Sequence, residues 1–173
     1  MRCVKTTDMV ITAVFAALIS VFSLIALPMP SAVPLTLQTF IIALTGFTLG
    51  SVKGVVSVLV YIAVGTVGVP VFSGFQGGLA VLFGITGGFI VGFIPFTLFC
   101  GIKSSSKLTR LLLSIVGLLL CHICGILWLS VHIKSISSAF ITASLPYLPK
   151  DIISISVAVL ISEKIKVITQ KFN

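Results

Sequence analysis

Long apolar runs, separated by short connections that are polar or rich in proline and glycine, dominate the pattern of this chain. The runs are Met9–Leu27, Leu35–Gly50, Gly54–Val69, Leu79–Cys100, Leu108–Val131 and Asp151–Ile168. They are continuous rather than alternating, which favours helices over half-buried strands. Most approach the roughly 20 residues that a helix needs to cross a bilayer, and tilt accommodates the shorter ones. The pattern therefore predicts a single all-α transmembrane domain over residues 1–173, built as a bundle of six membrane-spanning helices.

Two stretches leave alternatives open. The first run follows Arg2 and Lys5, as the apolar part of a signal peptide would, but it exceeds the roughly 7–15 residues typical of that part. We therefore expect a first helix that is retained. The segment from His132 to Pro149 mixes serines, apolar residues and prolines, so it fits either a short helix or a re-entrant element.

Lysine and arginine lie mainly on one side of the predicted bundle. With six spans, both termini share a side, which receives the basic residues Arg2, Lys5, Lys53, Lys103, Lys107, Arg110, Lys164, Lys166 and Lys171. The opposite side receives Lys134 and Lys150. Because loops rich in lysine and arginine stay in the cytoplasm, the sequence predicts an N-in/C-in orientation.

Composition agrees with a membrane protein. Mean hydropathy is +1.31, and charged residues make up 8% of the chain, whereas soluble domains carry roughly a quarter. The net charge of +8 is spread over several short loops, where it lies beside anionic lipid. A nucleic-acid partner is therefore not expected, because no basic patch interleaved with aromatic residues is present.

Proline and glycine gather in the connections assigned to the outer side. These residues are Pro28, Pro30, Pro34, Pro70, Gly74, Gly77, Gly78, Pro146 and Pro149. Irregular backbone at membrane depth is tolerated where it lines a cavity enclosed by protein. We therefore expect a pocket that opens outward.

Small residues recur every four positions in four of the runs. Two sets, Gly46, Gly50 and Gly54, and Gly84, Gly88 and Gly92, have the spacing that allows close helix approach, and we expect them to pack the bundle. The pair Ala13 and Ala17 on the first run could face either the bundle or a partner helix.

Few residues could carry out catalysis. The candidate acids and histidines are Asp8, Asp151, Glu163, His122 and His132. No nucleophile elbow, zinc-protease or P-loop motif occurs. Cys121 and Cys124 flank His122 with the spacing of metal ligands, but further ligands are not evident and buried cysteine usually packs as a small hydrophobe. We expect neither an enzyme nor a bound metal or cofactor.

Asp151 is the exception among the acids, because it begins the sixth run. A carboxylate near a helix start is stabilised by about 0.3–1 kcal/mol, which would explain it as an ordinary helix-end charge. An ionisable group at membrane depth is also a functional-site hypothesis, here as an acceptor for ligand N–H groups. The residues alone favour neither interpretation.

Several motifs, taken in order, resemble those of the BioY family, the biotin-binding S-components of energy-coupling-factor (ECF) transporters. The stretch from Val33 to Thr39 (VPLTLQT) resembles the family's VPxTLQT, and that from Gly84 to Phe89 (GITGGF) resembles GPTGGY. Between them, Gly68–Phe72 and the glycine-rich loop Ser73–Gly78 fall in the expected order. A thinner match covers Leu145–Asp151.

The resemblance implies a six-helix bundle that captures biotin at the outer face of a bacterial plasma membrane and moves it inward. Biotin offers two ureido N–H donors, a carbonyl and a carboxylate tail, so Asp151 is predicted to accept from the donors. The carbonyl or the tail could meet Gln38, Gln76 or Thr86. Apolar walls are predicted from Phe72, Phe75 and Phe89, as small-ligand pockets usually need.

Two departures from the family pattern concern the site. Ile85 and Phe89 replace the proline and tyrosine of GPTGGY, so one hydroxyl is lost. The family's Pro-Gly-Asp, followed three residues later by lysine, has Lys150 at the glycine and Ser154 at the lysine position. Lys150 is therefore the nearest candidate for the ligand carboxylate.

The resemblance also implies partners. S-components dock a transmembrane coupling subunit bound to two ATPases, partly through an Ala-x-x-x-Ala pattern that Ala13 and Ala17 fit, although a member could also work without that module. A small membrane-embedded enzyme, or a structural helical bundle, is the alternative. The enzyme would need a second polar residue converging with Asp151.

Overall fold

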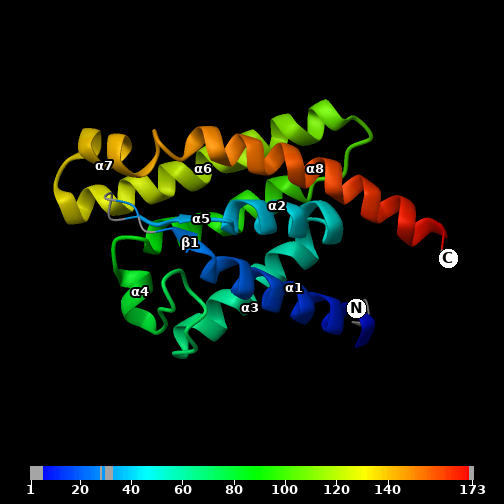
Figure 1. The fold of residues 1–173 in the computed structure, drawn as a ribbon, viewed down its shortest axis with the longest axis horizontal. Helices are drawn as coiled ribbons and strands as arrows, with labels where there is room; N and C mark the ends of the chain where they lie inside the picture. Colours follow the sequence, from blue (N-terminus) through cyan, green and yellow to red (C-terminus); the bar gives the residue numbers. More distant parts are fainter. Residues whose placement is uncertain (1–5, 28, 30–32, 172–173) are drawn as a thin grey trace.

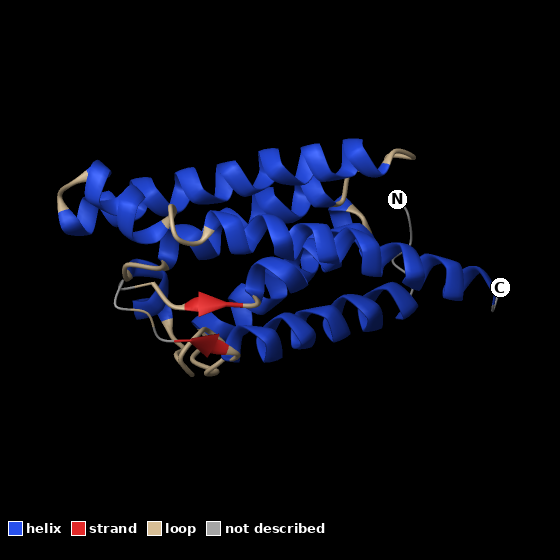
Figure 2. Ribbon diagram, turned by 45° about the horizontal axis from the view of Figure 1, so that its top comes forward, coloured by secondary structure: helices blue, strands red, loops and turns tan. Residues whose placement is uncertain are grey.

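The computed structural model describes residues 6–27, 29 and 33–171, with side chains as far as Ile165. Its elements are α1 (Thr6–Leu24), β1 (Ala26–Leu27), β2 (Leu35–Thr36), α2 (Gln38–Leu49), α3 (Ser51–Thr66), α4 (Leu79–Phe83), α5 (Gly87–Cys100), α6 (Lys107–Ile133), α7 (Ile136–Ala143) and α8 (Leu148–Lys171). The protein is a helical bundle (Figure 1). The two short strands pair antiparallel, with Ala26 opposite Thr36 (Figure 2).

The longer helices run along a common direction. α5 packs along α6, α2 packs against α8, and α1 packs against α3. α1 begins and α8 ends at one end of the bundle, which we call the terminal end; α4, α7 and the strands lie at the other, which we call the pocket end (Figures 1 and 2). This arrangement brings the start of α8 next to the middle of α6.

The observed helices differ from the predicted runs mainly where the backbone turns. The run Leu79–Cys100 is divided at Gly84–Thr86 into α4 and α5, and Leu35–Gly50 begins with strand β2 instead of helix. The first run leaves the helix at Leu24 and continues into β1. Of the two alternatives for residues 132–149, a short helix, α7, is present.

Helix length and hydropathy agree with a multi-pass membrane protein. Among the described residues, α1 and α6 are each long and apolar enough to cross a membrane, and α7 and α8 pass the same test as a pair bent by 49°. α2, α3 and α5 are shorter apolar helices.

Glycines allow the inner helices to approach closely, as their spacing predicts. A Cβ on Gly46 of α2 would lie 2.7 Å from Cys100 Cβ on α5. One on Gly92 of α5 would lie 2.9 Å from Cys121 Cα on α6. Gly50 has a different role, because its φ of 80° allows the sharp turn from α2 into α3.

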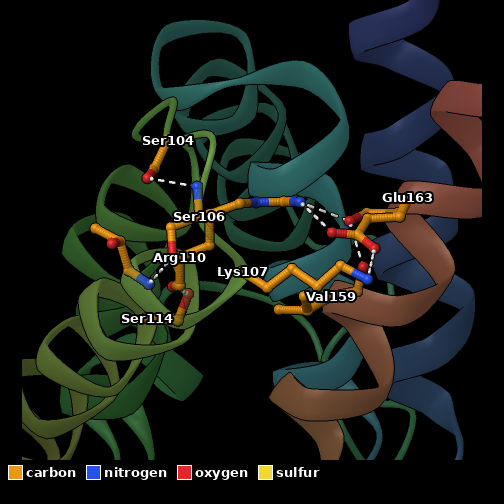
Figure 3. A network of polar contacts seen from close by, with 9 residues as sticks. Ser104, Ser106, Lys107, Arg110, Ser114, Val159 and Glu163 are labelled. Carbon is orange, nitrogen blue, oxygen red and sulfur yellow. Dashed lines mark hydrogen bonds and ion pairs between the residues drawn. The ribbon is translucent and has the colours of Figure 1, made fainter.

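A polar network ties α6 to α8 at the terminal end (Figure 3). Arg110 is 6% exposed; its guanidinium donates to Ser162 Oγ at 2.8 Å and lies 4.8 Å from the ring centroid of Phe47. Glu163 is 3.6 Å from Arg110 and 2.7 Å from Lys107 Nζ. Glu163 is thus part of a network that joins the two helices.

Candidate functional site

A largely apolar pocket lies between the helices at the pocket end, with about 690 Å³ of empty space including its open mouth. An apolar wall that carries a few convergent polar groups is typical of sites for small organic ligands. Its wall combines the starts of α2, α5 and α8, the middle of α6 and the loop after α3. The lining includes Phe72, Phe89, Phe93, Phe96 and Leu118 as apolar surfaces, and Thr36, Gln38, Thr39, Ser73, Thr86, His122, Lys150 and Asp151 as polar groups.

Asp151 is the buried acid of this pocket. It is 4% exposed, and each carboxylate oxygen has a partner from a different residue. Oδ1 lies 2.6 Å from Lys150 Nζ, and Oδ2 lies 3.2 Å from His122 Nε2. Lys150 is fixed in turn, because its ammonium also donates to the carbonyl of Thr36 at 2.8 Å. Buried charges that are paired in this way can remain ionised.

His122 links Asp151 to a second polar residue. Its Nδ1 lies 2.8 Å from Ser144 Oγ, and Phe89 meets the imidazole edge-to-face with ring centroids 5.8 Å apart. An ionised carboxylate can only accept hydrogen bonds, so Nε2 carries a proton toward Asp151, and in the neutral imidazole Nδ1 then accepts from Ser144. A polar residue therefore does converge with Asp151, a contact that sequence spacing did not reveal.

Gln38 faces the same pocket from the start of α2. Its Oε1 accepts from Thr36 Oγ1 at 3.0 Å, and its Nε2 donates to the Tyr61 hydroxyl at 2.9 Å. Tyr61 is fully buried and packs edge-on against Phe72. These contacts fix the amide orientation while leaving it one further N–H and one lone pair.

The model of the BioY family matches residues 1–171. The chain belongs to the BioY family. A relative from Pyrococcus horikoshii named "Probable biotin transporter BioY" is 38% identical, over 94% of this chain and 98% of the relative. The "Biotin transporter BioY" of Thermotoga maritima is 35% identical, over 88% and 92% of the two chains.

A solved structure supports the same architecture. The crystal structure of the S-component for biotin from an ECF-type ABC transporter superposes with a TM-score of 0.86 over 95% of each chain. The two sequences are 23% identical, so this likeness establishes the helical fold.

The structure brings together six of the eight residues predicted for the ligand site of this BioY protein. They are Asp151, Lys150, Gln38, Thr86, Phe72 and Phe89. Phe75 is not among them: it is 70% exposed, because a left-handed backbone (φ 58°) turns it out of the glycine-rich loop. Gln76 is also exposed and lines a neighbouring outer hollow, which shares Pro34, Ser73 and Thr86 with the pocket.

Several lining residues were not predicted from the sequence. Thr39, Ser73, Phe93, Phe96, His122 and Tyr147 all contribute to the wall. Helical spacing could have found two of them, since Phe93 and Phe96 lie one and two turns beyond Phe89 on α5. His122 and Tyr147 had no such signal, because their relation to the pocket depends on how α6, α7 and α8 pack.

Of the remaining predicted positions, Ala13, Ala17 and Ser154 lie outside the pocket, whereas Cys121 is part of its wall. Ala13 and Ala17 are exposed on α1 and face away from the core, so they do not pack the bundle. Ser154 is buried but does not line the pocket. Cys121 is buried beside the Phe89 carbonyl, and the described residues contain no group of three or more potential metal ligands.

Proposed function

We propose that this protein captures biotin in the pocket around Asp151 and delivers it across the membrane. The observation that carries the proposal is a buried carboxyl group, paired with Lys150 and His122, that lines a largely apolar pocket. The names of the relatives, biotin transporters over most of the chain, support biotin as the ligand.

The chemistry of the pocket matches the two ends of this ligand. The ureido group presents two N–H donors, and Asp151 has acceptor capacity beyond its contacts with His122 and Lys150. The phenyl rings of Phe72 and Phe89 would cover the bicyclic ring and alkyl chain. Gln38 and Thr86 remain available for the ureido carbonyl or the tail.

Lys150 is our candidate partner for the ligand carboxylate. It is the basic side chain that lines the pocket among the described residues, apart from the imidazole of His122. Its ammonium has three donors, of which the Thr36 carbonyl accepts from one, and it forms an ion pair with Asp151. A further donor could bind the tail without breaking the pair with Asp151.

The finer topology and partners belong to the same proposal. Six crossings, N-in/C-in, would put the basic terminal end in the cytoplasm of a bacterial cell and the pocket end outside. The exposed Ala13 and Ala17 offer α1 as a close-contact face for a transmembrane coupling subunit, itself bound to two ATPases. No cofactor is required for capture; biotin is the transported ligand.

The arrangement of Ser144, His122 and Asp151 raises the enzyme alternative, because the order of contacts is that of an acyl-transfer triad. Ser144 is fully buried and its side chain does not line the pocket. A nucleophile must reach substrate, so this serine cannot act as one. Biotin capture is therefore favoured over hydrolysis, and a structural bundle would not need the charged pocket.

Calorimetric titration of biotin into the purified chain in detergent tests the proposal. We expect saturable binding by the wild-type protein. Asp151→Asn replaces half of the acceptor capacity by donors and should weaken binding by about 10- to 100-fold, corresponding to about 1.5–3 kcal/mol for hydrogen bonds to a charged group. Absence of binding by the wild type, or unchanged affinity in Asp151→Asn, would contradict it.

A further inference from the structure

The contacts from Ser144 through His122 to Asp151 form one continuous chain at the back of the pocket. All three residues are buried, with Ser144 fully so. They come from separate elements: Ser144 follows α7, His122 lies in α6 and Asp151 begins α8. A polar chain that joins three elements inside an apolar bundle must be fully satisfied, since an unpaired buried group is costly.

The chain has a fixed direction of donation. Asp151 Oδ2 accepts from Nε2 of His122, and Nδ1 then accepts from the hydroxyl of Ser144. Because Ser144 is shielded from water, its hydroxyl has no competing solvent partner. The imidazole is thereby held in one tautomer and one orientation.

The hydrogen bond from His122 determines how the carboxylate of Asp151 is oriented. Lys150 forms an ion pair with Oδ1, whereas His122 makes the hydrogen-bond contact at Oδ2, so the orientation of the carboxylate depends on His122. The remaining lone pairs of the carboxylate can only accept hydrogen bonds. Without His122, Oδ2 would lose this donor, and the carboxylate could rotate toward Lys150.

We propose that His122 is a positioning residue for ligand capture, which keeps Asp151 an oriented acceptor and so selects ligands that present N–H donors. This inference rests on the proposed function, because it concerns the same pocket. It assigns a role to a histidine that lies on a different helix from Asp151. When Asp151 is already held in the orientation that the ligand needs, less conformational entropy is lost on binding, which is the advantage of a positioning residue.

Two substitutions of similar size separate positioning from packing. In His122→Gln the amide nitrogen can reach the place of Nε2 and donate to Asp151; in His122→Asn the amide reaches only the place of Nδ1, next to Ser144. Both remove the ring from its contact with Phe89. We expect biotin affinity within about 3-fold of wild type for His122→Gln and a loss of about 10-fold or more for His122→Asn, one tenfold step being about 1.4 kcal/mol.

A double-mutant cycle supplies the decisive measurement. In an Asp151→Asn background, His122→Asn should weaken biotin binding by less than about 2-fold, because the group that it positions is already changed. Equal losses in His122→Gln and His122→Asn, wild-type affinity in His122→Asn, or effects that multiply in the double variant would overturn the inference.

The proposed function, as distinct from the positioning role of His122, is contradicted if the wild-type chain binds no biotin in the same titration.

If His122→Asn does not fold, as judged by its elution and melting in detergent, Ser144→Ala tests the positioning role instead. It removes the donor to Nδ1 and frees the imidazole to change tautomer, so we expect biotin binding to weaken by about 3-fold or more. Unchanged affinity in Ser144→Ala would then overturn the positioning role.

Discussion

Replacing Arg110 by alanine should destabilise the bundle without weakening the ligand site. The guanidinium is buried and donates to Ser162, a hydrogen bond from a charged group worth about 1.5–3 kcal/mol. Its position over Phe47 adds about 0.5–1 kcal/mol or more. Glu163 keeps its contact with Lys107, so the ion pair is only partly lost. We expect a loss of about 2–4 kcal/mol in the free energy of unfolding.

Unfolding by SDS in mixed micelles, followed by circular dichroism, measures this loss. Lys107→Ala is the matched control: the lysine pairs with the same Glu163 but its side chain is 67% exposed, and exposed pairs contribute about 0–1 kcal/mol. Equal destabilisation by Arg110→Ala and Lys107→Ala would refute the argument from burial. Biotin affinity of Arg110→Ala should stay within about 2-fold of wild type, because the pocket lies at the opposite end.

Three further outcomes are expected. Gly46→Ala should destabilise the protein by about 1–3 kcal/mol in the same unfolding assay, because its Cβ would meet α5. Trp at Ala13 or Ala17 should reduce co-purification with a coupling subunit while biotin binding persists; loss of both would mean that α1 supports the pocket. Single cysteines at Ser73 and Ser105, each in a background free of native cysteine, test the orientation. An impermeant maleimide should label the cysteine at position 73 from outside and the one at position 105 only after permeabilisation. The reverse would refute the N-in/C-in orientation.

Most of the helical framework was predictable, because continuous apolar runs in a chain with so little charge have few other solutions. The observed elements differ from the predicted runs where a turn or a short strand interrupts the helix. Gly84 interrupts the run that would have joined α4 to α5, and its extended conformation caps α4. The β1–β2 pair has only two residues in each strand, too few for an alternating pattern to be visible.

The candidate site was predictable only in part. Asp151 was found because an acid at the start of an apolar run is unusual, and the family motifs added Gln38, Phe72, Thr86 and Phe89. The contact between His122 and Asp151 was not found, since it depends on the packing of α6 against α8 and no local period connects the two residues. Phe75 shows the converse, because a residue within the right loop can still point outward.

The two ends of the α6–α8 pair limit how a ligand can enter. Arg110 and His122 lie about three turns apart on α6, as do Glu163 and Asp151 on α8, which is about 18 Å at the helical rise. A polar contact therefore joins the two helices at each end of this stretch. Parting them would expose both sets of buried polar groups to lipid, where an unsatisfied group costs several kcal/mol. Ligand entry is thus expected to move the connections that line the pocket, namely those that carry Pro34 and Ser73, while α6 and α8 stay together.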